Sequence, residues 1–197
     1  MNLGKKFIFL GLISIFIITS LTMFSFASEE KDHIKRALVL IDEEKYNEAV
    51  GELEEALMIV KSKANLELVN VSFTEEEAWG FGMYNQREGT IFSQGETFFM
   101  YGEARNYSIK EIKKDLYEIH IKEDIYILDK NNNVLFKQED FLDYHITSHS
   151  KNFDLFINNT LIQTSPFPVG DYKFLLVLKD VFFEKTTEVT IDFTVVE

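Results

Sequence analysis

The chain has 197 residues, its 33 acidic side chains outnumber its 20 basic ones, and cysteine is absent. So acidic a chain repels phosphate backbones and anionic lipid, which argues against nucleic acid as a partner and against peripheral binding to a charged membrane. Without cysteine there is no thiol nucleophile, no cysteine metal site and no disulfide scaffold, so the fold must rest on its hydrophobic core.

The first 27 residues have the organisation of a secretory signal. Residues 5 and 6 are lysines, an apolar run spans residues 7–18, and residues 25–27 (Ser-Phe-Ala) place small side chains three and one positions before a cut ahead of Ser28. This order predicts export to an extracytoplasmic location, periplasmic or secreted, with cleavage before Ser28. After cleavage we expect no stable membrane insertion.

An uncleaved membrane anchor is the alternative interpretation of the same segment. From Phe7 to Phe26 the stretch counts 20 residues, which is long enough to span a bilayer. Four Ser and Thr residues make its second half polar, however, and no aromatic and basic belt marks its far end. Cleavage removes two lysines and no acid, which leaves 18 basic and 33 acidic side chains in 170 residues, a formal charge of −15.

Residues 28–64 show the apolar periodicity of two helices separated by a break at residues 42–45. Each helix is apolar on one side only, so we expect the two apolar stripes to pack against each other in an antiparallel hairpin. The first stripe comprises Ile34, Ala37, Leu38 and Ile41, and the second comprises Ala49, Val50, Leu53, Ala56, Leu57 and Val60.

The second of these helices resembles the second helix of a tetratricopeptide repeat. The resemblance rests on Tyr-Asn-Glu-Ala-Val at residues 46–50 and on the apolar and small residues that follow. It covers about 34 residues, the length of one repeat. In that family small residues let the helices approach closely, and the corresponding positions here are Ala37, Ala49 and Ala56.

The chain departs from that family at His33 and Arg36, where large apolar residues are usual, and at Lys61, where the closing proline is usual. A solenoid needs about three stacked units to bury its faces, and this chain has one, so the peptide groove of longer arrays is not implied. The outer apolar residues must meet the sandwich, another chain or water. We expect Leu40 and Met58, which lie off the main stripes, to contact a partner or a second copy.

From residue 66 to the end the apolar period changes from 3.6 to 2, which predicts a second, strand-rich domain at 66–197, joined to the hairpin near Ala64 and Asn65. The clearest strands cover residues 172–178 and 189–195. Seven or so short strands with polar turns predict an antiparallel β-sandwich, and the overall fold class is then α+β.

Two of the expected strands break the alternation. Leu66 and Leu68 share one parity, whereas Val71 and Phe73 have the other, so the register of the first strand is open. The long strand over residues 117–127 places apolar side chains at every second position except at Glu123. A charged residue at an inward position conflicts with the pattern of a buried strand.

The last part of the chain resembles the closing hairpin of bacterial immunoglobulin-like sandwiches. Residues 166–168 (Pro-Phe-Pro) end one strand, and Gly170 turns the chain into the next. The resemblance implies an immunoglobulin-like sandwich. It implies no particular function, because such sandwiches host many unrelated roles.

No constellation of residues indicates catalysis or a bound metal. Asp129, Asn131 and Asn133 mimic the first ligands of a calcium loop, but both flanks are strand-like, and we interpret the segment as a hairpin turn. His145 and His149 lack further ligands at the spacing of a zinc site. We therefore expect a protein that is not an enzyme, without catalytic residues, cofactor or metal.

Aromatic residues are concentrated between residues 79 and 107. Rigid rings beside arginine can form a recognition surface, and they can equally fill the sandwich, with an Arg–Glu pair pinning the loop; we favour the second interpretation. Exposure of Trp79 separates the two, because stacking on a glycan needs exposed rings. The candidate binding residues are Trp79, Phe81, Tyr84, Arg87, Tyr101 and Arg105.

The leading hypothesis for function is a non-enzymatic, exported interaction module of the cell envelope. It docks a protein partner or forms a homo-oligomer through its hairpin. The alternative is an extracytoplasmic protein that binds a small ligand, glycan or peptide, with the aromatic segment 79–107.

Overall fold

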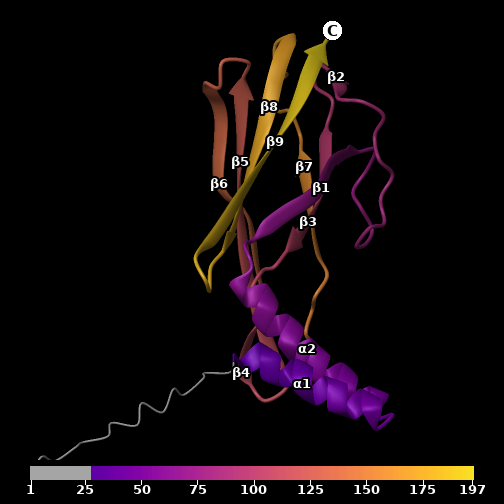
Figure 1. Cartoon of the computed structure of the whole chain (residues 1–197). Helices are drawn as coiled ribbons and strands as arrows, with labels where there is room; N and C mark the ends of the chain where they lie inside the picture. The colour runs from indigo at the N-terminus through magenta and orange to yellow at the C-terminus, as the bar shows by residue number, and fades with distance from the viewer. Residues whose placement is uncertain (1–27) are drawn as a thin grey trace, which may run out of the picture.

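The computed structural model describes residues 28–197, and the expected signal segment lies outside these described residues. Two helices are followed by nine strands in this part of the chain. Figure 1 shows the helices at one end of an elongated β-sandwich and the C-terminus at the other end. The expected α+β class, with a helical hairpin that precedes a β-sandwich, is confirmed.

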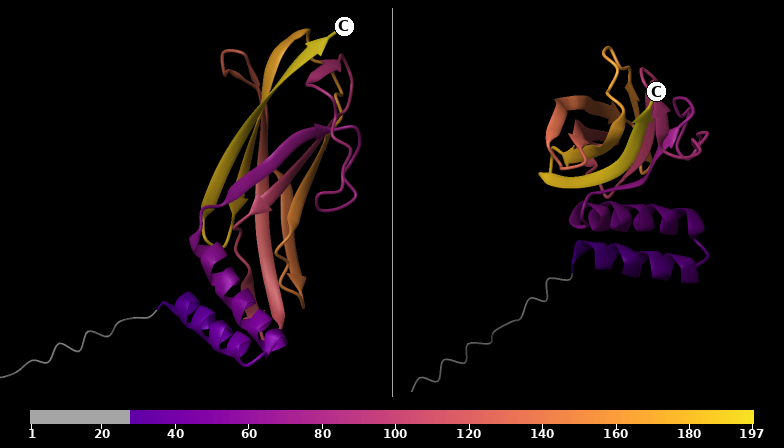
Figure 2. Two further views of the ribbon diagram at one scale, coloured as in Figure 1. Left: turned by 45° about the vertical axis from the view of Figure 1, so that its right-hand side comes forward. Right: turned by 90° about the horizontal axis from the view of Figure 1, so that it is seen from above.

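The hairpin consists of α1 (Glu29–Asp42) and α2 (Tyr46–Lys63). The first turn of α1 carries three acidic residues and the last turn of α2 carries two lysines, charges that the helix dipole favours at those ends. The connection is short, and Glu44 turns the chain with a φ of 58°. The helices are therefore neighbours that run in opposite directions (Figure 2).

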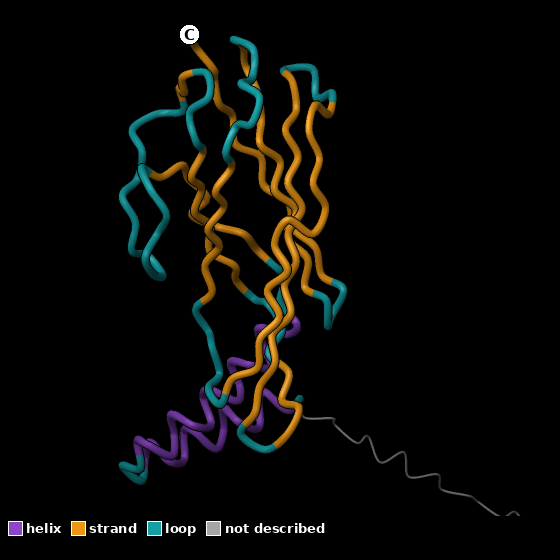
Figure 3. Tube along the Cα trace, turned by 180° about the vertical axis from the view of Figure 1, so that it is seen from behind, coloured by secondary structure: helices purple, strands orange, loops and turns teal. Residues whose placement is uncertain are grey.

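The strands form two sheets that pack face to face (Figures 1 and 3). The smaller sheet is antiparallel, in the order β1-β3-β7: β1 (Glu67–Thr74), β3 (Phe98–Arg105) and β7 (Leu155–Leu161). The larger sheet has the order β2-β9-β8-β5, and β4 and β6 both pair with β5. Its strands are β2 (Ile91–Ser93), β4 (Lys110–Lys113), β5 (Leu116–Asp129), β6 (Val134–Ser148), β8 (Gly170–Asp180) and β9 (Lys185–Val196). All of these pairs are antiparallel except β2 with β9.

The two breaks in alternation have structural causes. The register of β1 on β3 shifts between Val69 and Ser72, and Asn70 has a φ of 52°, so an irregularity of the bulge type moves the apolar parity to the other set of positions. In β5, Glu123 keeps the inward direction of its neighbours and is fully buried. Glu123 therefore does occupy an inward position of a buried strand, and its carboxyl group lies inside the sandwich.

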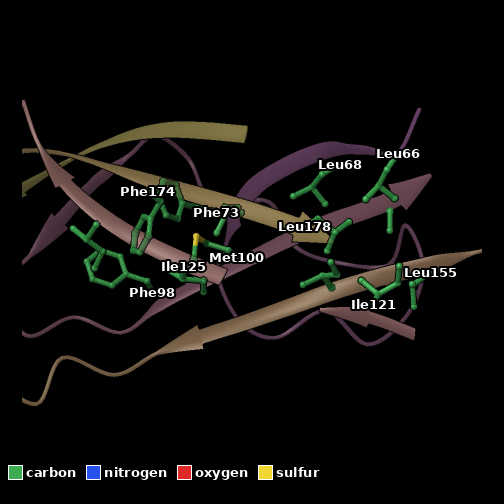
Figure 4. Packing of buried hydrophobic residues seen from close by; sticks show 14 of the residues in the cluster. Leu66, Leu68, Phe73, Phe98, Met100, Ile121, Ile125, Leu155, Phe174 and Leu178 are labelled. Carbon is green, nitrogen blue, oxygen red and sulfur yellow. The ribbon is translucent and has the colours of Figure 1, made fainter. Parts of the chain in front are cut away.

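The core lies between the sheets and combines a group of aromatic rings with a larger number of aliphatic side chains (Figure 4). Five phenylalanines form its centre, with pairs of ring centroids 4.6 to 6.5 Å apart, mostly in edge or tilted arrangements. They come from both sheets and are Phe73, Phe92, Phe98, Phe174 and Phe193. Tyr107 is buried in the same cluster. Much of the aromatic segment thus fills the sandwich, as the favoured interpretation expected.

Helix α2 docks on the sandwich, and α1 lies on its far side (Figure 2). Met58 packs against the sandwich core. The Lys61 ammonium donates to the Phe153 carbonyl at 3.0 Å, and Lys185 donates to the Lys61 carbonyl at 3.1 Å. The expectation that Met58 contacts a partner is therefore wrong, because the sandwich already covers that side of α2.

Candidate functional site

The two helices contact each other through small residues. Ala37, Ala49 and Ala56 are the buried residues of the hairpin. The large apolar residues of the predicted stripes are not packed between the helices, so the expectation that the whole stripes face each other is wrong. The alanines set the line of contact because they allow the closest approach, and the larger side chains are displaced to its side.

The displaced residues, together with Tyr46 at the start of α2, form one surface, which we call the apolar hairpin face. On each helix they lie on the same side of the alanine line, three or four residues apart, and because the helices are antiparallel both sets point to the same side of the hairpin. Each is 39–61% exposed. The face consists of Ile34, Leu38 and Ile41 from α1, and Tyr46, Val50, Leu53, Leu57 and Val60 from α2.

The opposite side of the hairpin carries ion pairs beside Val39, which is 57% exposed. The Glu52 carboxylate accepts from Arg36 Nε at 2.8 Å and lies 2.7 Å from His33 Nδ1. The hydrogen bond from Arg36, and to a smaller extent the one from His33, holds the pKa of Glu52 below its usual range. Leu40 is half-buried and lines a shallow groove here with Arg36 and Glu52. His33 and Arg36, which depart from the repeat pattern, thus join the two helices through a carboxylate.

The second candidate surface is the loop of residues 75–90 between β1 and β2, which we call the aromatic loop. Trp79 is 57% exposed, and Phe81 and Met83 are exposed beside it. The loop makes its own tight turn, in which the Trp79 amide donates to the Met83 carbonyl at 3.1 Å and Gly82 adopts a φ of 67°. Glycine suits that left-handed conformation. The exposure of Trp79 is the observation that the ligand-binding alternative requires.

Polar contacts hold the aromatic loop over the outer side of the smaller sheet. The Asn158 side chain accepts from the Ala78 amide at 3.1 Å and donates to the Ala78 carbonyl at 2.7 Å. The Gly82 amide donates to the Tyr101 hydroxyl at 2.7 Å, and Tyr84 stacks on Tyr101 with ring centroids 4.1 Å apart. The exposed rings therefore stand on a fixed base.

The other candidate binding residues do not join this surface. Tyr101 is buried, its hydroxyl donates to Glu103, and burial raises its pKa, so it supports the loop and has no surface for a ligand. Arg87 pairs with Glu96 at 2.7 Å and stacks on Phe92. That pair confirms the expected Arg–Glu pin. Arg105 pairs with Glu103 at the end of β3.

Met83 at the loop tip was not among the expected binding residues, and the hairpin surface was expected at Leu40 and Met58 rather than on the apolar stripes. The sequence does contain a signal for the exposed face. On each helix the large apolar residues lie to one side of the alanines and not on the same line along the helix. Close packing of helices prefers the small residues on the contact line. The larger set then marks an outer face.

The turn of residues 129–133 and the histidine pair have partners within the fold. One Asp129 oxygen accepts from the amides of Asn131 and Asn133 at 2.8 Å, and the other accepts from the Asn133 side chain. His145 pairs with Glu118, and His149 bonds to a backbone carbonyl. Within residues 28–197, no group of three or more His, Asp or Glu side chains is placed to hold a metal ion. Neither helix of this described part is long and apolar enough to cross a membrane.

No protein-family model matches the chain, and a comparison with curated proteins found no similar sequence.

Proposed function

We propose that this protein is a non-enzymatic interaction module of the cell envelope, exported by its N-terminal signal, that associates with a second copy of itself through the apolar hairpin face. In this proposal the hairpin is a single tetratricopeptide-like unit carried by an immunoglobulin-like sandwich. The observation that supports it is the exposure of eight large apolar side chains on one side of two adjacent helices. Contiguous apolar surface of this kind is uncommon on soluble monomers.

The apolar hairpin face is large enough to support a dimer contact. The exposed fractions of its eight residues, mostly Val, Leu and Ile, sum to about four fully exposed side chains. Full burial of such a side chain stabilises by about 1.5–3 kcal/mol. Two such faces therefore contribute roughly 10–20 kcal/mol before the costs of association are subtracted.

The charge of the hairpin also favours a second copy over a strongly basic partner. Helix α1 carries four acidic and three basic side chains, without counting His33, and α2 carries four acidic and two basic ones. The helices thus contribute only −3 to the formal charge of −15 of residues 28–197. Two hairpins can approach with little repulsion, and charges farther apart than about 8 Å are largely screened at physiological salt.

A two-fold axis parallel to the helices gives a reasonable geometry. It places α1 of one copy over α2 of the other, so that every neighbouring pair in the resulting four-helix bundle is antiparallel. Antiparallel neighbours place the positive end of one helix dipole beside the negative end of the next, which is favourable. The same patch serves both copies, which is the definition of a closed dimer contact.

The test is the oligomeric state of the chain without its signal, measured by size-exclusion chromatography with light scattering. We expect a dimer, and we expect the double variant Leu38→Glu, Leu53→Glu to be monomeric at concentrations at least a hundredfold higher, because two buried carboxylates per copy oppose association. The matched control Ile91→Glu, Val169→Glu changes two exposed apolar residues of the sandwich. It should remain dimeric.

Circular dichroism checks that the hairpin variant keeps its helices. A monomeric parent chain at about 100 μM, or a double variant that dimerises like the parent, would show that the face does not bind a second copy.

A second candidate function is binding of a glycan or peptide by the aromatic loop, favoured by the exposure of Trp79 and Phe81 on a fixed base. Trp79 is the only tryptophan of the chain, so its fluorescence reports on this loop alone. We expect ready quenching by acrylamide, and protection of at least twofold by a stacking sugar such as cellohexaose. Trp79→Ala should change the free energy of unfolding by less than about 0.5 kcal/mol. Unaltered quenching with cellohexaose would count against the glycan form of this function.

A further inference from the structure

The two sheets of the sandwich are unequal, and one strand of the larger sheet is left partly uncovered. The smaller sheet has three strands against six in the larger one. The strand β6 pairs only with β5, and residues Val134 to Asp140 at its start are exposed throughout. An additional strand beside β7 would lie over this part of β6.

A groove of about 440 Å³ occupies that position, between the first half of β6 and the end of β7 with the loop that follows it. Figures 1 and 3 show the turn between β5 and β6 and the loop after β7 at the end of the sandwich away from the helices. Most of the lining is apolar or aromatic, the remainder is amide or hydroxyl, and none of the lining residues is charged. Its apolar side chains include Leu135, Phe136, Phe141, Leu161, Ile162 and Phe167.

The strand edges beside the groove are available for pairing. Within residues 28–197, β7 pairs with β3 alone and β6 with β5 alone, so the outer edge of each carries backbone amides and carbonyls without a strand partner. Natural edge strands are usually blocked by charges or proline. The seven residues of β7, Leu-Phe-Ile-Asn-Asn-Thr-Leu, contain neither.

We propose that this groove accepts an extended, uncharged peptide segment of a partner protein, which adds to β7 as a fourth strand of the smaller sheet. Main-chain hydrogen bonds to the free edge of β7 hold the segment, and its alternate apolar side chains enter the groove against β6. Pairing along the whole of β7 takes about seven residues, or roughly 23 Å. Only Thr160 and Leu161 of β7 border the groove, so the side chains that enter it belong to the part of the segment that pairs with this end of β7. The uncharged lining disfavours ionic side chains, because the groove offers them no partner.

This site is separate from the apolar hairpin face and does not depend on it. The ligand chemistry also differs, since the groove recognises an extended backbone and the hairpin recognises helices. Either of the two proposed sites can therefore exist without the other. The experiment for the groove includes the hairpin variant for that reason.

The probes are fluorescent heptapeptides of alternating Val and Thr, Ile and Thr, or Phe and Ser, with one lysine at each end for solubility. We expect at least one of them to bind, measured by fluorescence anisotropy, and to protect β7 amides from hydrogen exchange. The same peptide with N-methyl groups on alternate amides keeps its side chains and charge but cannot form the ladder. It should bind at least tenfold more weakly.

Two protein variants locate the site. Leu135→Lys, Ile162→Lys places charges in the groove at two exposed positions and should weaken peptide binding at least tenfold. Leu38→Glu, Leu53→Glu in the hairpin should leave it unchanged. The proposal is overturned if no heptapeptide binds at 1 mM, if the N-methylated peptide binds equally well, or if binding protects amides elsewhere than in β7.

Discussion

Replacing Glu123 with glutamine is expected to remove a pH dependence of stability of about 3 kcal/mol. The Glu123 side chain is fully buried in β5, and neither carboxyl oxygen has a hydrogen-bond partner of good geometry. Burial raises its pKa from 4.5 to about 7; the charge of Asp124 adds to the shift, and the neighbouring Asn159 side chain opposes it. The folded protein therefore prefers the neutral acid.

The sign of the effect follows from the two pKa values. Below pH 4.5 the group is neutral in both the folded and the unfolded chain, and its contribution to stability is fully present. As the pH rises from 4.5 to about 7, the unfolded chain loses the proton while the folded chain retains it, so the free energy of unfolding falls. Above pH 7 the loss is complete. Glutamine stays neutral throughout and shows none of it.

Urea denaturation of both proteins between pH 4 and 8 measures this difference. The quantity to compare is the difference in free energy of unfolding between the two proteins at each pH. The pKa values of Asp124, Asp129 and Asp143 are lowered in the fold, so these groups reduce the stability of both proteins as the pH falls, and the difference removes their effect. The control Glu188→Gln, on the exposed face of β9, should parallel the parent chain. A difference between parent and Glu123→Gln that does not vary with pH would mean that the fold does not raise the pKa of Glu123.

Replacing Phe174 with alanine is expected to cost about 3–5 kcal/mol of stability. Phe174 is fully buried in β8. Its ring lies 4.7 Å from that of Phe193 in its own sheet, and 5.9 and 5.2 Å from those of Phe73 and Phe98 in the opposite sheet. Removal of the ring leaves a cavity at the point where the two sheets meet, and neighbouring rings can fill it only in part.

The matched control is Phe183→Ala, in the turn between β8 and β9, where the ring is mostly exposed. It should change the free energy of unfolding by less than about 0.5 kcal/mol. Thermal and urea denaturation at pH 6 measure both variants. A loss below about 1 kcal/mol for Phe174→Ala would show that these rings do not join the two sheets.

Local periodicity determined the secondary structure of this protein to a large extent. The hairpin was expected over residues 28–64 and is observed over Glu29–Asp42 and Tyr46–Lys63. The alternating segments 172–178 and 189–195 lie within β8 and β9. These elements could be predicted because a single face buried at a period of 3.6 or 2 leaves its mark in neighbouring residues. Glu123 was recognised as an exception by the same argument.

Which surfaces remain open was decided only by tertiary structure. Periodicity identifies an apolar side of a helix, but not whether alanine or leucine occupies the contact line, and so it did not show that Leu38 and Leu53 stay exposed. Trp79 and Phe92 stand in one aromatic segment, yet only Phe92 is buried. Phe92 packs among the core rings of both sheets, whereas Trp79 lies in a loop that Asn158 holds at Ala78 across 80 positions of sequence. Contacts between distant residues, such as this one and the pairing order that leaves β6 uncovered, depend on the packing of whole elements, which no local pattern encodes.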